Sequence, residues 1–77
     1  MERDVEIRGE MIRLGQLLKL AGVIDAGGQA AAFLATTAVL VNGEPEQRRG
    51  RQLHPGDAVE IGDERLRVTG EGTPGAR

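Results

Sequence analysis

Three arginines lie close together in the second half of the chain and could bind phosphate. Arg48, Arg49 and Arg51 follow a predicted strand and turn. Each guanidinium is planar, permanently charged and carries paired N–H donors that match a phosphate group. The residue types alone leave two interpretations open: a phosphate-binding loop, or a solvated loop of the kind that most surface charge clusters form.

A glycine pair offers a second candidate for phosphate binding. Gly27 and Gly28 open the second predicted helix, where free backbone N–H groups and the positive helix pole attract anions. Glycine also lets a phosphate approach the main chain closely, although both glycines could simply form a turn. Arg13 and Lys19, near the two ends of the first predicted helix, are further basic candidates that would equally suit a structural role.

Catalysis and metal binding find little support in the residue types. His54 is the only histidine and the chain has no cysteine, which excludes thiolate and multi-histidine metal sites. No serine or cysteine nucleophile is available to His54. We expect Glu44 and Glu46 to be exposed beside a turn, with no reason for a raised pKa. We therefore predict a protein that is not an enzyme and has no cofactor.

The composition bounds the size and surroundings of the fold. A chain of 77 residues with 39% apolar residues predicts a single domain over residues 1–69, with an aliphatic core because Phe33 is the sole aromatic residue. Residues 70–77 show no apolar pattern and are predicted to be a disordered tail. The charged N-terminus and the lack of a long apolar run predict a cytoplasmic protein with no membrane contact, and we expect a monomer.

The charge distribution is uneven along the chain. The net charge is −2, which does not by itself indicate a nucleic-acid-binding protein. Basic residues outnumber acidic ones between Ile12 and Leu53, whereas the two ends of the chain are acidic. This pattern favours a local basic patch over a uniformly basic surface.

Periodicity and turn signals predict the elements that would position these residues. We expect helices over residues 13–20 and 28–35, the first ended by Gly22 and the second capped by either Asp25 or Gly27. Predicted strands cover residues 4–8, 38–41, 58–61 and 66–68, with a loop over 48–52. Asn42-Gly43 is the strongest turn signal, and Leu53 is expected to be a buried anchor after the arginine loop.

Several short motifs recur together in an order that resembles a known family. They are Ile12-Arg13-Leu14, Leu17-Leu18-Lys19-Leu20, Gly27-Gly28-Gln29-Ala30, Val39-Leu40-Val41-Asn42-Gly43 and Pro55-Gly56-Asp57. This succession resembles the alpha-L RNA-binding motif, the S-four-like RNA-binding domain named after a small-subunit ribosomal protein. The version seen here is similar to the stand-alone YbcJ-like subfamily. The resemblance covers residues 12–61, about two thirds of the chain.

The resemblance implies an α+β fold in which two short helices pack on a small, bent, mostly antiparallel sheet. It also implies binding to structured RNA, either ribosomal or transfer RNA, and association with ribosomal particles. The RNA-binding residues that it implies are Arg13, Lys19, Gly28, Gln29, Asn42, Arg48, Arg49 and Arg51.

Two departures from the family pattern affect this expectation. Ala31 and Ala32 stand where the second helix often carries a basic residue, so RNA binding would depend more heavily on the arginine loop. The residues Thr36-Thr37-Ala38 replace an acidic residue and glycine before the strand. Because a threonine at positive φ is costly, we expect this turn to be remodelled.

Two other functional classes remain as alternatives. Val41 to Glu44 followed by Pro55 to Ile61 is also similar to β-grasp sulfur carriers. Those carriers need a C-terminal Gly-Gly, whereas this chain ends Thr73-Pro74-Gly75-Ala76-Arg77. The second alternative is a protein-interaction adaptor, in which an acidic face of a partner protein would contact the same arginines.

Overall fold

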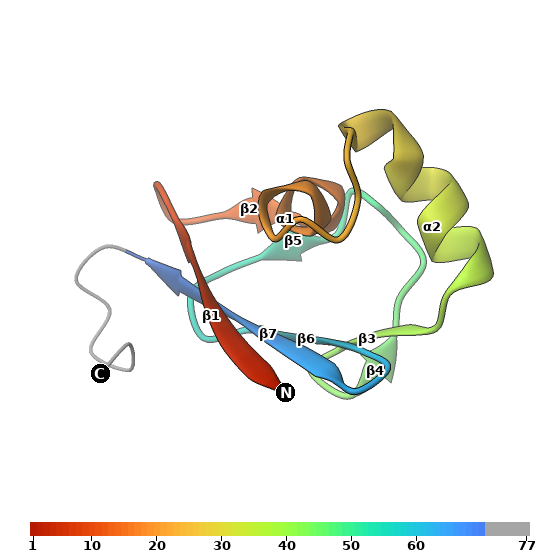
Figure 1. Cartoon of the computed structure of the whole chain (residues 1–77). Helices are drawn as coiled ribbons and strands as arrows, with labels where there is room; N and C mark the ends of the chain where they lie inside the picture. The colour runs from red at the N-terminus through yellow and green to blue at the C-terminus, as the bar shows by residue number, and fades with distance from the viewer. Residues whose placement is uncertain (71–77) are drawn as a thin grey trace.

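Two short helices lie over one face of a five-stranded sheet in the computed structural model, which describes residues 1–70 (Figure 1). The helical elements are α1 (Leu14–Leu20), the 3₁₀ turn η1 (Gly27–Gln29) and α2 (Ala30–Thr36). The strands are β1 (Glu2–Ile7), β2 (Ile12–Arg13), β3 (Val39–Val41), β4 (Glu44–Pro45), β5 (Gln52–Leu53), β6 (Ala58–Ile61) and β7 (Glu64–Gly70). This arrangement confirms the predicted α+β fold.

The sheet joins the first strand of the chain to the last. Its strand order is β1-β7-β6-β3-β4, and only the β1–β7 pair is parallel among the pairs that the structure describes. A second, two-stranded sheet pairs β2 with β5, with Ile12 opposite Leu53 and Arg13 opposite Gln52. This small sheet connects the residues just before α1 to those just after the arginine loop.

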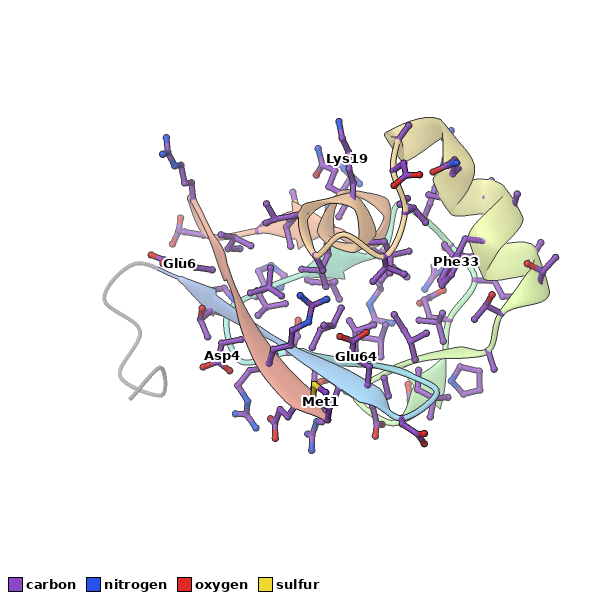
Figure 2. The ribbon with its side chains drawn as sticks, viewed as in Figure 1. Met1, Asp4, Glu6, Lys19, Phe33 and Glu64 are labelled. Atoms are coloured by element: carbon purple, nitrogen blue, oxygen red, sulfur yellow. The ribbon has the colours of Figure 1, made fainter. Side chains whose placement is uncertain are left out.

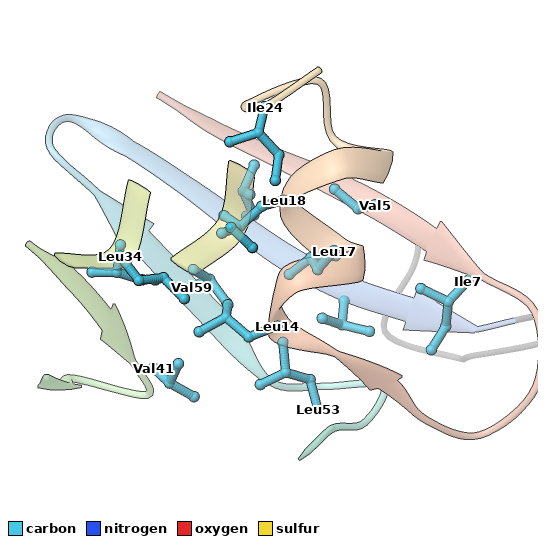
Figure 3. Packing of buried hydrophobic residues seen from close by; sticks show 14 residues of the cluster. Val5, Ile7, Leu14, Leu17, Leu18, Ile24, Leu34, Val41, Leu53 and Val59 are labelled. Carbon is cyan, nitrogen blue, oxygen red and sulfur yellow. The ribbon is translucent and has the colours of Figure 1, made fainter. Parts of the chain in front are cut away.

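The core forms between the helices and one face of the sheet, and it is entirely aliphatic at its centre (Figure 3). Its fully buried large side chains are Leu14, Leu17, Leu18, Leu34, Val41, Leu53, Val59, Leu66 and Val68. The alternation of β1 places Val5 and Ile7 in this core and leaves Glu2, Asp4 and Glu6 exposed. The sheet is therefore amphipathic, with charged residues on the face turned away from the helices.

Helix α1 ends as its sequence predicts. Gly22 has a φ of +79°, and its N–H donates to the Lys19 carbonyl at 3.0 Å while the Val23 N–H donates to the Leu18 carbonyl at 2.9 Å. These two bonds form a Schellman motif, which satisfies carbonyls that the last turn would otherwise leave unpaired. The motif reverses the chain so that Ile24 packs into the core.

Both predicted helices and the four predicted strands are confirmed with changed ends, but the short strands β2 and β5 were not predicted. Arg13 belongs to β2 instead of the first helix, and Gln52 belongs to β5 instead of the loop. The second helix begins with the 3₁₀ turn, and β7 extends over Glu64–Gly70 instead of residues 66–68. Thr37 is extended, with a φ of −128°, so this threonine does not adopt the costly positive φ. Gly70, which was predicted to belong to the tail, is the last residue of β7. The rest of the predicted tail, residues 71–77, lies outside the described residues.

Candidate nucleic-acid interface

The arginine loop, residues 46–51, forms the N-terminal support of α1. The Leu14 N–H donates to the Arg51 carbonyl at 2.8 Å, and the Gly15 N–H donates to the Arg49 carbonyl at 2.9 Å. The first N–H groups of a helix have no partner within the helix, and no side chain caps this end of α1. The loop backbone therefore takes the place of a capping side chain and is itself fixed against the helix.

Gly15 makes this close approach possible. A Cβ atom at this position would lie 3.2 Å from the Ala30 Cβ and 3.4 Å from the Arg49 Cβ. Both distances are shorter than ordinary van der Waals contacts between carbons. The absence of a side chain at Gly15 thus lets α1, the start of α2 and the arginine loop meet at one point.

Glu46 is buried, contrary to the expectation that it would be exposed. Its side chain is 6% exposed, and its two carboxylate oxygens accept bonds from both neighbouring arginines. Arg48 donates from Nε to Oε2 at 3.0 Å and from Nη2 to Oε1 at 3.1 Å, and Arg51 donates from Nη1 to Oε1 at 2.8 Å. The backbone N–H groups of Gln47 and Arg48 donate to Oε2 as well. We call Glu46, Arg48 and Arg51 the Glu46 cluster.

The bonds to Glu46 change the charge that the arginine loop presents. Hydrogen bonds from the Arg48 side chain, then from the Arg48 backbone and the Arg51 side chain, hold the pKa of the Glu46 carboxyl well below its usual range. The same contact raises the pKa of Arg48. Glu46 is therefore ionised at neutral pH, and its single negative charge offsets one of the two positive charges of Arg48 and Arg51.

A groove beside α1 collects a different set of basic residues. We call it the α1 groove; its volume is about 1170 Å³, and it is lined by Glu6, Ile7, Arg8, Met11, Ile12, Arg13, Gly15, Gln16, Lys19, Leu20, Gly27, Ala30, Arg49 and Gly50. Figure 2 shows Lys19 projecting from α1 on the side away from the sheet. The lining residues come from the end of β1, from α1, from the start of η1 and α2, and from the arginine loop.

The unpaired basic side chains of residues 1–70 gather in this groove. Ion pairs join Arg3 to Glu64, Arg67 to Glu2, and both Arg48 and Arg51 to Glu46. Among the described residues, the basic side chains without a carboxylate partner are Arg8, Arg13, Lys19, Arg49 and Arg65. All of them except Arg65 line the α1 groove. The groove also contains one carboxylate, that of Glu6.

The residues predicted to bind RNA are distributed unequally around this groove. Arg13, Lys19 and Arg49 line it, and the Arg13 Nη1 donates to the Gly50 carbonyl at 3.1 Å. Arg48 and Arg51 instead line a smaller hollow of about 560 Å³ with Gly50, Gln52 and His54. The structure therefore divides the predicted arginine loop between two sites.

Three of the predicted residues lie in turns. The Gln29 Oε1 accepts bonds from the backbone N–H groups of Asp25, at 2.7 Å, and Ala26, at 3.0 Å. Neither Asp25 nor Gly27 is the cap that the sequence left open, because the N-cap residue of η1 is Ala26. The Asn42 side chain donates to the Asp57 Oδ1 at 3.1 Å and accepts from the Ala58 N–H at 3.0 Å, which ties two turns together. Gly28 is exposed, and its contact with RNA stays a prediction.

Sequence reasoning missed Arg8 and Gln16 as groove residues. Arg8 belongs to the acidic N-terminal segment, so the charge distribution gave no reason to select it. Gln16 lies one helical turn after Arg13, and its Oε1 accepts a bond from the Arg13 N–H at 3.2 Å. Helical spacing places it on the same face of α1 as Lys19, but Gln16 carries no charge that would mark it as a candidate.

Other functional groups contribute no site in the described part of the chain. The His54 N–H donates to the Asp57 Oδ2 at 2.8 Å, which stabilises the turn between β5 and β6. Residues 1–70 contain no group of three or more side chains placed to bind a metal ion. No helix within the same residues is long and apolar enough to span a membrane.

Comparison with known proteins identifies the family. Residues 5–69 match the S4 domain. Among the relatives is the probable ribosome maturation protein RlbA of Bacillus subtilis (strain 168), which is 57% identical over 61 residues that cover 79% of this chain and 86% of RlbA. The matched region contains both helices, the sheet and the α1 groove. The chain therefore belongs to the S4 domain family, the family of the alpha-L RNA-binding motif.

Proposed function

We propose that this protein binds structured RNA, ribosomal or transfer RNA, through phosphate contacts in the α1 groove, and that it acts in a ribosome-related process. Membership of the S4 domain family supports RNA binding, and the name of the relative RlbA supports the link to ribosome maturation. Of the three arginines in the loop, Arg49 has the leading role because it alone lines the groove, and Arg8 at the end of β1 joins it.

The observation that carries the proposal is the separation of paired from unpaired cations. Arg8, Arg13, Lys19 and Arg49 converge on one groove from separate segments of the chain, and no carboxylate of the described residues forms an ion pair with them. Grouping like charges in one place is unfavourable for the isolated protein. A polyanion that lies along the groove would remove this repulsion.

Phosphate contacts fit the groove better than stacking of several bases. Phe33 is the only aromatic residue in the sequence, and it is not among the residues that line the groove. Proteins that bind single strands without sequence preference stack successive bases on aromatic side chains. A groove rich in cations and without aromatics is suited to the ordered phosphates of a folded RNA.

The proposal can be tested by measuring RNA binding at several salt concentrations. Fluorescence anisotropy with folded ribosomal RNA fragments should show an affinity that falls steeply with salt, because about three to four phosphates release their counterions. The double substitution Lys19→Ala with Arg49→Ala should lower the affinity and reduce the slope of log K against log salt by about two.

Arg65→Ala provides the matched control. Arg65 is exposed and unpaired like the groove residues, but it alternates with the buried Leu66 and lies outside the groove. Its removal should leave both the affinity and the salt slope unchanged. Binding that is independent of salt, or that weakens equally in the control and the double variant, would contradict the proposal.

A further inference from the structure

The α1 groove combines its cations with an exposed apolar surface. Leu20 is 55% exposed and Met11 is 37% exposed; among residues 1–70 the only other large hydrophobic side chain classed as exposed is that of Met1. Leu20 and Met11 both line the groove, together with the partly buried Ile12. Exposed apolar side chains that gather in one hollow commonly mark a binding surface. Phosphate binding alone gives no reason for them.

We propose that the α1 groove accepts an unpaired nucleotide of a structured RNA, with the base against Met11 and Leu20 and the flanking phosphates on the surrounding cations. This inference rests on the proposed function and specifies the RNA feature that the site prefers. Perfect A-form duplex presents phosphates and riboses but hides its base faces in the stack. A bulged or looped-out nucleotide presents both an apolar base face and its phosphates.

The chemistry of the lining suits such an occupant. The thioether of Met11 is polarizable and makes favourable contacts with aromatic rings, and the Leu20 side chain offers apolar area to a base face. The groove is open and has a volume of about 1170 Å³, which leaves room for a nucleotide. Lys19 lies next to Leu20 on α1, and Arg49 comes from the arginine loop.

Gln16 supplies polar contacts within the same groove. Its Oε1 accepts the Arg13 N–H, and within residues 1–70 its amide nitrogen has no hydrogen-bond acceptor. An amide nitrogen can donate to the carbonyl and ring-nitrogen acceptors on a base edge. Glu6 is the one carboxylate that lines the groove, and its negative charge would repel a nearby phosphate. We therefore place the phosphates nearer to Lys19 and Arg49 than to the end of β1.

The test compares a perfect hairpin RNA with four hairpins that differ from it only by a single bulged A, C, G or U in the stem. The wild-type protein should bind at least one bulged hairpin about tenfold more tightly than the perfect one, because only a bulged RNA can bury a base face against Met11 and Leu20. The double variant Met11→Ser with Leu20→Ser should bind all five hairpins with similar affinity. Both side chains are exposed, so urea unfolding should confirm that the variant keeps its stability.

Lys19→Ala is the matched control for this experiment. It should weaken binding to the perfect and bulged hairpins by the same factor and leave their ratio unchanged. If the wild type binds all five hairpins equally with a steep salt dependence, this inference is wrong and the proposed function stands. If it binds none of them, both are wrong. If the serine variant keeps the preference for a bulge, the apolar surface serves another partner, such as a protein, and the inference is overturned.

Discussion

The Glu46 cluster and the α1 groove draw on the same short loop, yet they use its arginines differently. Arg48 and Arg51 share one buried carboxylate, whereas Arg49, between them, forms no ion pair and lines the groove. Neighbouring arginines of one loop thus have different roles. The Glu46 cluster fixes the loop against α1, and Arg49 joins cations from elsewhere in the fold.

Ion pairing also explains how a protein with a net charge of −2 can have a basic site. The carboxylates of Glu2, Glu46 and Glu64 form ion pairs with arginines. These ion pairs offset part of the positive charge within the structure. What remains unpaired lies mainly in one groove. Local pairing, rather than total charge, decides where an anion would bind.

Charge reversal in the groove should have the largest effect on RNA affinity. Lys19→Glu and Arg49→Glu should each weaken binding about tenfold, and together about 100-fold if the two sites act independently. Each substitution removes a phosphate contact and adds a repulsive charge. Binding titrations with a folded RNA would measure this, with Arg65→Glu as a control expected to stay within about twofold of wild type. An equal loss in the control would remove the distinction between groove and remaining surface.

Removal of the buried carboxylate should mainly affect stability. Glu46→Ala should lower the free energy of unfolding by about 2 kcal/mol, because two guanidinium groups and two backbone N–H groups lose their acceptor. Glu44→Ala removes an exposed carboxylate two residues earlier and should change stability by less than about 0.5 kcal/mol. Urea unfolding of the two variants measures the difference. Similar values would show that the Glu46 cluster does not support the fold.

The contribution of Glu46 should depend on pH in a defined direction. Its folded-state pKa lies below the ordinary value of 4.5, so its stabilisation is complete above about pH 4.5 and is lost as the pH falls. In that acidic range wild-type stability should decline by up to about 1.4 kcal/mol per pH unit from this group alone. In Glu46→Gln this pH-dependent contribution is missing. The free energies of unfolding of the wild type and the variant should therefore converge as the pH falls. A constant difference from about pH 6 to about pH 3 would contradict the assignment.

The smallest effect is expected within the loop itself. Arg49→Ala should weaken RNA binding about fivefold, whereas Arg48→Ala should change it by no more than about twofold, because Arg48 is ion-paired with Glu46 and lies outside the α1 groove. Parallel anisotropy titrations of the two single variants compare two arginines adjacent in the chain. Equal losses would mean that Glu46 does not decide which arginine is available to RNA.

Local signals were sufficient for most of the elements. The spacing of Leu14, Leu17 and Leu18 indicated α1, and all three side chains are buried. Asn42 and Gly43 have φ values of +52° and +86°, which only a few residue types adopt readily, so the turn was visible in the sequence. These features depend on neighbours within a few positions, where steric and capping preferences act directly.

The candidate site was predicted less completely, because its composition depends on distant contacts. The sequence identified Arg13, Lys19 and Arg49 as basic candidates, but it also placed Glu46 on the surface. Burial of Glu46 follows from the path of the loop between β4 and the β2–β5 pair, which no local pattern encodes. Arg8 could not be selected, since its approach to α1 depends on where β1 ends in the folded sheet.

The sequence by itself determined the positions of the helices and of the main turns, the aliphatic core and the supply of cations, because each follows from residue type and short-range spacing, and its family resemblance implied the α+β architecture. Only the tertiary structure decided which cations remain available. Which cations remain available depends on which arginines form ion pairs with carboxylates, both within residues 46–51 and on the sheet. It also depends on the close approach that Gly15 permits between α1 and Arg49. Coulombic pairing acts over a few ångströms in space and takes no account of separation along the chain.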